Sequence, residues 1–296
     1  MARVVESKKA CTVNPLKMSQ PLGAAYAEQV LARGAGLQGV EVELGGDPYR
    51  TLTVFPAARP SGDVLVFFHG GGWTSGYKEW MFFMAPALNA RGVTLVCAGY
   101  RLAPQHVFPT GFDDCADAVA WVLRHIGAHG GDPRRVFVGG HSSGGHLAAL
   151  LAVSDGWRTA RGLGAQPLAG GLPVSGTYRF GQGSGLSMRP RFLGPADDGQ
   201  ADIAAAPLAQ LNAAACPPLL LAWGSRDFPH LVRQSEEMER ALQAAGVPVQ
   251  RLVLDGCDHF QASLACGDAD GAWVGPAVAW MRQQGAARPS STGEVQ

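Results

Sequence analysis

The sequence has 296 residues, and its 24 Lys and Arg balance 24 Asp and Glu, so the formal net charge is zero. A nucleic-acid binder would show a basic excess or a basic stripe, and this sequence shows neither, which excludes nucleic acid as a partner. Only 16% of the residues are charged. Hydrophobic residues reach 47%, and the 40 glycines are roughly twice the average share. We therefore expect a globular protein with a sizeable buried core.

The first 20 residues predict a loose arm, without the apolar run of a secretory signal. No stretch approaches the ~20 apolar residues of a membrane span. The six cysteines are scattered, with no CxxC pair and no zinc spacing. These observations favour reduced thiols, a cytoplasmic location, no membrane contact, no cofactor and no metal.

A helix is expected at 21–33, and two alternating strands at 40–44 and 51–55 flank a Gly-Gly-Asp-Pro turn typical of a hairpin. The strand at 64–68 is apolar on both faces, as in a parallel sheet covered on each side. Further strands are expected at 93–98, 136–139, 168–174, 219–223 and 251–254, alternating with helices at 79–90, 112–125, 145–153, 231–245 and 271–284. The alternation predicts an α/β fold: a mostly parallel, doubly wound sheet with helices on both faces. Its ligand crevice should lie beyond the carboxyl ends of the strands.

One α/β domain is expected over residues 1–285. Residues 175–218, rich in Gly, Pro, Ala and Arg, are too long for an ordinary connection. We favour a partly helical lid over the crevice for this stretch, with a loose surface excursion as the alternative. The polar tail at 286–296 predicts disorder.

A serine nucleophile is indicated by Gly140-His141-Ser142-Ser143-Gly144, which fits G-x-S-x-G between an apolar strand and a helix-forming run. The serine of this motif sits on a strained turn, so the positions two before and two after it have little room for a Cβ. Ser143 does not fit the frame, because residue 141 is a histidine.

A serine hydroxyl needs a base, and the base needs an orienting carboxylate. In this motif's usual chain order the acid precedes the histidine, which points to Asp227 and His259, each just beyond a buried strand. The rival histidine is His230, at a helix start. The rival acids are Asp255 and Asp258, which as sequence neighbours of His259 are poorly placed to reach its far ring nitrogen.

Acyl transfer also needs donors for the developing oxyanion. His69-Gly70-Gly71-Gly72 follows a buried strand, and glycines there let backbone N–H groups face the substrate. The backbone N–H of Ser143 supplies the remaining donor. A flexible turn is the alternative for the glycines, and a phosphate loop is disfavoured because its Lys-Ser/Thr is missing.

The separated motifs are His69-Gly70-Gly71-Gly72-Trp73, Gly99-Tyr100-Arg101-Leu102-Ala103-Pro104, Phe112-Asp113-Asp114, Gly140-His141-Ser142-Ser143-Gly144-Gly145 and Asp258-His259-Phe260. Together they resemble the α/β-hydrolase fold, specifically the hormone-sensitive-lipase-type esterases, over roughly residues 60–285. The resemblance implies that Ser142 is the nucleophile, Asp227 the acid and His259 the base. It also implies that the oxyanion donors are Gly71, Gly72 and Ser143.

Two positions depart from that family: His141 replaces its usual acidic residue, and Gln105 replaces the glutamate after its YRLAP. His141, together with Trp73 and the run His146-Leu147-Ala148, is more similar to kynurenine formamidase (arylformamidase) and its carboxylesterase relatives. These departures leave the substrate undetermined, but they do not change the expected reaction class.

We expect a serine hydrolase that cleaves a small carboxylic ester. One alternative is an arylformamidase acting on N-formylkynurenine or a related formamide, and a remote one is a non-catalytic ligand binder. The substrate should be a small, uncharged or aromatic molecule, and a homo-oligomer is compatible with the sequence. The residues expected to line the pocket are Trp73, His141, Phe228 and Phe260.

Overall fold

A computed structural model describes residues 3–5, 21–186, 191–195 and 199–287 of the chain. The strands in these ranges form one nine-stranded sheet in the order β1-β2-β3-β5-β4-β6-β7-β8-β9. Their bounds are β1 Arg3–Val5, β2 Val40–Glu43, β3 Thr51–Phe55, β4 Val64–Phe68, β5 Thr94–Ala98, β6 Val136–His141, β7 Gly170–Val174, β8 Leu219–Gly224 and β9 Val249–Leu254. The pairs β1–β2, β2–β3 and β3–β5 are antiparallel and the other pairs are parallel. The predicted mostly parallel sheet is confirmed.

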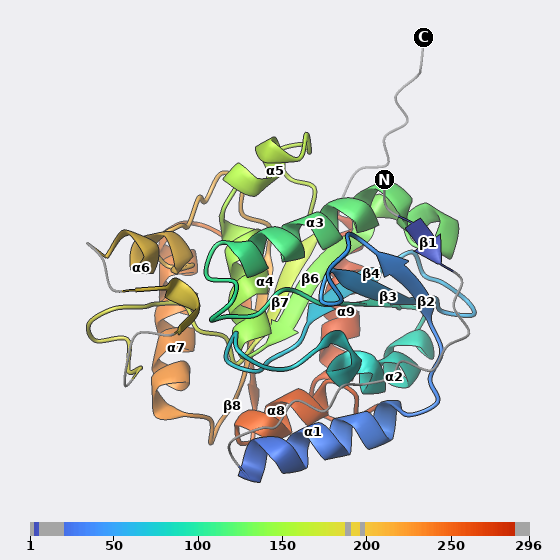
Figure 1. The fold of residues 1–296 in the computed structure, drawn as a ribbon, viewed down its shortest axis with the longest axis horizontal. Helices are drawn as coiled ribbons and strands as arrows, with labels where there is room; N and C mark the ends of the chain where they lie inside the picture. Colours follow the sequence, from blue (N-terminus) through green and yellow to red (C-terminus); the bar gives the residue numbers. More distant parts are fainter. Residues whose placement is uncertain (1–2, 6–20, 187–190, 196–198, 288–296) are drawn as a thin grey trace.

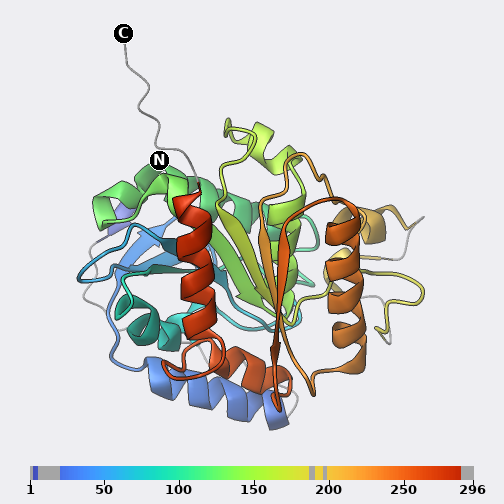
Figure 2. The ribbon, with the colours of Figure 1, turned by 180° about the vertical axis from the view of Figure 1, so that it is seen from behind.

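Helices cover both faces of this sheet (Figure 1): α3 and α4 lie on one face, and α9 crosses the opposite face, as Figure 2 shows from behind. The α-helices are α1 Pro21–Gly34, α2 Ala85–Asn89, α3 Thr110–His125, α4 Ser143–Val153, α5 Gly156–Ala160, α6 Gln200–Ala205, α7 Pro229–Ala244, α8 His259–Ala265 and α9 Val274–Ala286. Short 3-10 helices are η1 Lys78–Met84, η2 Ile126–His129, η3 Pro133–Arg135 and η4 Arg191–Leu193.

Strand β4 shows why both faces must be covered. Its five residues are all buried, and because successive side chains point to opposite faces, they divide between two hydrophobic clusters. Val66 and Phe68 join the cluster on the α4 side, whereas Leu65 and Phe67 pack in the cluster that contains Trp273 and α9. The continuous apolar pattern of the central strands follows from this double burial.

Some predicted boundaries were wrong. The helix expected at 79–90 is divided into η1 and α2, and the last helix begins at Val274 rather than at 271. Helix α8 was missed, although Asp258 and Gln261 form a capping box at its start. Within the expected N-terminal arm, Arg3–Val5 pairs with β2.

The predicted lid, residues 175–218, begins after β7 and contains η4 and α6. Its positions 187–190 and 196–198 lie outside the described residues, as does the 288–296 part of the predicted tail. Gln234 of α7 anchors the start of this stretch: its Oε1 accepts the N–H groups of Tyr178 and Arg179, at 2.7 and 2.8 Å. Its Nε2 donates to the carbonyl of Ser184 at 2.6 Å.

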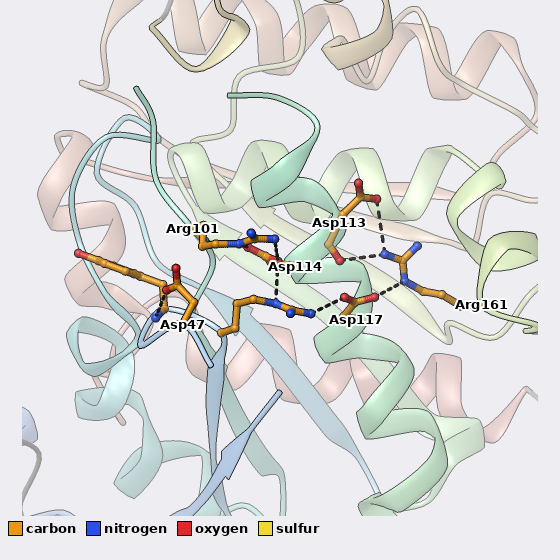
Figure 3. A network of polar contacts seen from close by, with 8 residues as sticks. Asp47, Arg101, Asp113, Asp114, Asp117 and Arg161 are labelled. Atoms are coloured by element: carbon orange, nitrogen blue, oxygen red, sulfur yellow. Dashed lines mark hydrogen bonds and ion pairs between the residues drawn. The ribbon is translucent and has the colours of Figure 1, made fainter. Parts of the chain in front are cut away.

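An arginine–aspartate network fixes the loop after β5 to α3 (Figure 3). The backbone N–H, Nε and Nη2 of Arg101 donate to the carboxylate of Asp114, at 3.0, 2.8 and 2.8 Å. Arg50 forms ion pairs with Asp114 at 3.1 Å and with Asp117 at 2.9 Å, and Arg161 donates to Asp117 at 2.8 Å. Because the Asp114 side chain is only 2% exposed, these cations compensate a charge that water does not reach.

Candidate active site

Ser142 lies on the turn between β6 and α4, at the carboxyl edge of the sheet. Its backbone has φ 56° and ψ −118°, a conformation that non-glycine residues rarely adopt. A Cβ built on Gly140 would lie 2.3 Å from the carbonyl oxygen of Gly144, and one on Gly144 would lie 2.2 Å from that of Phe68. The spacing of the motif therefore has the steric cause expected from the sequence.

The structure brings three predicted residues into one hydrogen-bond chain. The Oγ of Ser142 lies 3.0 Å from Nε2 of His259, and Nδ1 of His259 lies 2.8 Å from Oδ1 of Asp227. A carboxylate only accepts, so Nδ1 carries the ring proton and Nε2 accepts from the serine hydroxyl. His259 is the first residue of α8, after β9, and Asp227 follows β8. Segments 117 residues apart thus meet at the same sheet edge.

Asp227 is held as an anion by several donors. Burial alone would raise the pKa of its carboxyl, but the hydrogen bond and charge of His259 and the bonds from Ser175 and the Phe228 N–H lower it. Ser175 Oγ donates to Oδ2 at 2.5 Å, and the Phe228 N–H donates to Oδ1 at 2.7 Å. Sequence reasoning missed Ser175, whose only signal was its place directly after the strand β7.

The rival residues have other partners. The carboxylate of Asp258 accepts the N–H groups of Phe260 and Gln261 and caps α8. Asp255 accepts a hydrogen bond from Ser225 at 3.2 Å. The ring of His230 stacks on that of Phe228, with centroids 5.9 Å apart.

The glycine loop after β4 has a backbone that only glycine adopts readily. Gly71 and Gly72 have φ of 123° and 61°. A Cβ on Gly71 would lie 2.1 Å from the carbonyl oxygen of Ser75, whose own N–H and hydroxyl donate to the Gly71 carbonyl. Only glycine fits there, and the two donors of Ser75 hold the Gly71 carbonyl in place. Ser143 begins α4, so its N–H is among the first-turn donors that have no partner within the helix.

His69 supports this loop from below, as a structural residue. Its Nδ1–H donates to the Gly70 carbonyl at 2.7 Å, and its ring stacks on Tyr100 with centroids 4.3 Å apart. The hydroxyl of Tyr100 donates to the carbonyl of His69 at 2.9 Å. The glycine turn is therefore attached to the loop after β5.

His141, expected in the substrate pocket, lies elsewhere. It is 2% exposed, and its Nε2–H donates to the backbone carbonyl of His259 at 2.8 Å. The two rings lie with centroids 4.6 Å apart. As the last residue of β6 its side chain points into the protein beneath His259, so it holds the backbone of that residue rather than facing substrate.

Of the other residues expected in the pocket, Phe228 is 47% exposed, and the centroid of its ring lies 4.8 Å from that of the His259 ring. Phe260 is half-buried and packs against Tyr26 of α1, with centroids 5.1 Å apart. Trp73 lines a small, partly open pocket. The other residues around that pocket are Tyr100, Arg101, His106, Phe108, Gly111, Phe112, Leu147 and Phe192.

Within the described ranges, no group of three or more His, Cys, Asp or Glu side chains is placed to hold a metal ion. In the same ranges, no helix has both the length and the hydropathy needed to cross a membrane.

Acid should destabilise the fold through three buried histidines. Burial lowers the pKa of His69 and of His146 to about 4, and burial with the nearby His259 lowers that of His141 to about 3. An unfolded histidine titrates near pH 6.5, so below that pH the unfolded chain binds protons that the folded chain does not. The contribution of these three histidines to the free energy of unfolding is thus fully present above pH 6.5. It decreases as the pH falls toward the pKa that each histidine has in the folded protein.

From pH 7 to pH 5.5 the loss should be about 1 kcal/mol per histidine, or roughly 3 to 4 kcal/mol for the three. Urea unfolding at the two pH values measures it. His146→Gln should reduce the pH-dependent part by about a third, whereas equal stability of the wild-type protein at both values would contradict the prediction.

The chain belongs to the family of the alpha/beta hydrolase fold, whose model matches residues 65–262. An isoprenylcysteine alpha-carbonyl methylesterase of Arabidopsis thaliana is 27% identical over 234 residues, which are 73% of this chain and 55% of that protein. The carboxylesterase NlhH of Mycobacterium tuberculosis is 38% identical over 115 residues, 38% of this chain and 34% of that one. The chain spans little more than half the length of the methylesterases that it matches.

Among solved structures, a bacterial heroin esterase is 26% identical with a TM-score of 0.69, covering 88% of this chain and 90% of its own. An esterase/lipase from an uncultured bacterium, at 22% identity, has a TM-score of 0.71, with 93% and 95% covered, and shows the fold. The predicted family is confirmed. The formamidase alternative gains no support from these relatives, which are named as esterases.

Proposed function

We propose that the chain is a carboxylesterase that hydrolyses small esters through Ser142, His259 and Asp227. The observation that carries the proposal is the hydrogen-bond chain from the Ser142 hydroxyl through the His259 imidazole to the Asp227 carboxylate, at 3.0 and 2.8 Å. A serine so connected has a base for its proton and an anion to stabilise the resulting imidazolium. The esterase names of the relatives support the same reaction class.

In the first half of the reaction, the Oγ of Ser142 attacks the ester carbonyl while its proton passes to Nε2 of His259. The tetrahedral oxyanion accepts hydrogen bonds from the N–H groups of Gly71, Gly72 and Ser143. When the intermediate collapses, the C–O bond to the alcohol breaks, and His259 returns the proton to the leaving oxygen. Ser142 is left acylated.

In the second half, His259 takes a proton from a water molecule, whose oxygen attacks the acyl carbon. The bond to Ser142 Oγ then breaks, the serine regains its proton from His259, and the carboxylic acid leaves. Asp227 stays ionised throughout, consistent with the lowering of its pKa by the donors around it.

The substrate is proposed to be small and uncharged or aromatic. The pocket beside Trp73 is lined mainly by aromatic and aliphatic side chains, which favour such groups. Its one guanidinium, Arg101, already donates both Nε and Nη2 to Asp114, so it has little to offer a carboxylate ligand.

We also propose that the described parts of this stretch, residues 175–186, 191–195 and 199–218, form a cap over the crevice, named the cap from here on. Phe192, within this stretch, stacks on Trp73 directly after the glycine loop, with centroids 4.3 Å apart. A cytoplasmic location remains a prediction.

The test is a panel of p-nitrophenyl esters with acyl chains of two to twelve carbons, set beside an aryl formamide. The expected result is the highest kcat/KM on the shortest chains, with the formamide at least tenfold lower. A fluorophosphonate should also add one label, on the peptide that contains Ser142. Absence of both ester turnover and label in the folded protein would refute the proposal.

A further inference from the structure

One buried imidazole connects the glycine loop to the cap. His146 lies on α4, one turn after Ser142, and its backbone N–H donates to the Ser142 carbonyl at 2.9 Å. The indole Nε1–H of Trp73 donates to Nδ1 of His146 at 3.1 Å. On the other side of the ring, Nε2 lies 2.7 Å from the carbonyl oxygen of Ala205, the last residue of α6.

The partners determine the protonation of this ring. A backbone carbonyl only accepts, so Nε2 of His146 carries a proton, and an indole N–H only donates, so Nδ1 carries none. The ring is therefore neutral and bridges two segments that lie 73 residues before it and 59 residues after it. The lowering of the pKa of His146 by burial agrees with this neutral state.

Trp73 makes the bridge relevant to the chemistry. It follows Gly72 directly and itself has φ 62°, a left-handed conformation that a bulky residue adopts only when its surroundings impose it. Its indole is 8% exposed, stacks on Phe192 and packs edge-to-face on His146. Phe180 and Phe192, both from the cap, also contact the His146 ring, with centroids 5.2 and 5.6 Å away.

We propose that His146 is a positioning residue for the oxyanion loop: by holding the Trp73 indole on one side and the Ala205 carbonyl of α6 on the other, it sets the N–H groups of Gly71 and Gly72 for the transition state. The inference rests on the proposed function and adds to it a residue that connects the oxyanion loop to α6. A histidine that merely filled the core would affect stability and leave the ratio of kcat to KM unchanged.

The test compares Trp73→Phe with a matched control, Trp157→Phe. Trp157 is also a buried indole, and its Nε1–H donates at 2.9 Å to the Leu151 carbonyl, at the far end of the same helix. Both variants lose one indole hydrogen bond and similar ring area. Only Trp73→Phe should lower kcat, by about 10- to 100-fold, since losing an oxyanion donor outright costs on the order of 10² to 10³.

Two further measurements separate positioning from packing. The affinity for a trifluoromethyl ketone, which forms an oxyanion on the serine, should fall with kcat, whereas KM for p-nitrophenyl acetate should change less than about twofold. His146→Leu should lose as much kcat as Trp73→Phe, and the double variant no more, because both break one connection. His146→Gln, which keeps one acceptor and one donor, should recover part of the loss.

Unchanged kcat in Trp73→Phe, an equal loss in Trp157→Phe, or a loss confined to KM would each overturn the inference. Trp73→Phe alone carries the test if His146→Leu does not fold. Fluorophosphonate labelling of Ser142 in the wild-type protein distinguishes failure of the proposed function from failure of this inference. If Ser142 is not labelled, the proposed function fails. If Ser142 is labelled but Trp73→Phe leaves kcat unchanged, only the inference fails.

Discussion

Ser142→Ala should lower kcat/KM for p-nitrophenyl acetate by about 10⁴- to 10⁶-fold, because it removes the hydroxyl that is proposed to form the acyl-enzyme. The fold should survive. Serine and alanine both carry a Cβ, so the variant meets the same backbone strain at φ 56° as the natural residue. Among the described residues, the Oγ of Ser142 forms a hydrogen bond only with Nε2 of His259, so one hydrogen bond is lost.

Initial rates at enzyme concentrations high enough to detect this residual activity measure the effect, with circular dichroism and thermal unfolding to verify the fold. Ser154→Ala is the matched control: its hydroxyl donates to the Leu150 carbonyl at the opposite end of α4, and its kcat/KM should stay within about twofold of wild type. More than a tenth of wild-type activity in Ser142→Ala would mean that another group is the nucleophile.

Asp227→Asn should lower kcat by about 10³- to 10⁴-fold with little change in KM. If the amide oxygen faces Nδ1 of His259, the ring keeps its tautomer but loses the negative charge that stabilises the imidazolium. If the amide NH₂ faces it, Nδ1 must accept, and the proton moves to Nε2, where it prevents His259 from taking the serine proton. The first orientation also keeps an acceptor for the Phe228 N–H, and either orientation retains a partner for the Ser175 hydroxyl, so the fold should be kept.

The control is Asp258→Asn, beside His259 in sequence. Its carboxylate caps α8 through two N–H groups, and asparagine caps a helix about as well. Its kcat should stay within about threefold of wild type. A loss in Asp258→Asn equal to that in Asp227→Asn would make the position of α8, rather than the charge of Asp227, the cause.

The clearest sequence signals were those that depend on neighbours in the chain. The strands predicted at 51–55 and 64–68 have those bounds in the structure, since apolar residues bounded by turn residues define them locally. The turn at Ser142 was likewise readable, because the glycines that it requires lie two residues on either side. Helix α8, only seven residues long, was too short to show a hydrophobic period, and its capping signal was overlooked.

Residues whose roles depend on distant segments were misassigned or missed. His141 was expected to face substrate, but the partner of its Nε2 is a carbonyl 118 residues away. Ser175 reaches Asp227 across 52 residues. No local pattern records such pairs, because they arise only when the carboxyl ends of neighbouring strands are brought to one edge of the sheet.

The sequence by itself determined the mostly parallel α/β sheet and the turn at Ser142, since apolar periodicity and glycine sterics act between residues close in the chain. The fold family and the candidate residues Ser142, Asp227 and His259 followed from its motifs and from their resemblance to a known family. Only the tertiary structure decided which polar groups surround these residues: Ser175 beneath Asp227, His141 beneath His259, and His146 between the glycine loop and α6. Hydrogen bonds require partners within about 3 Å, and packing, not sequence spacing, sets those distances.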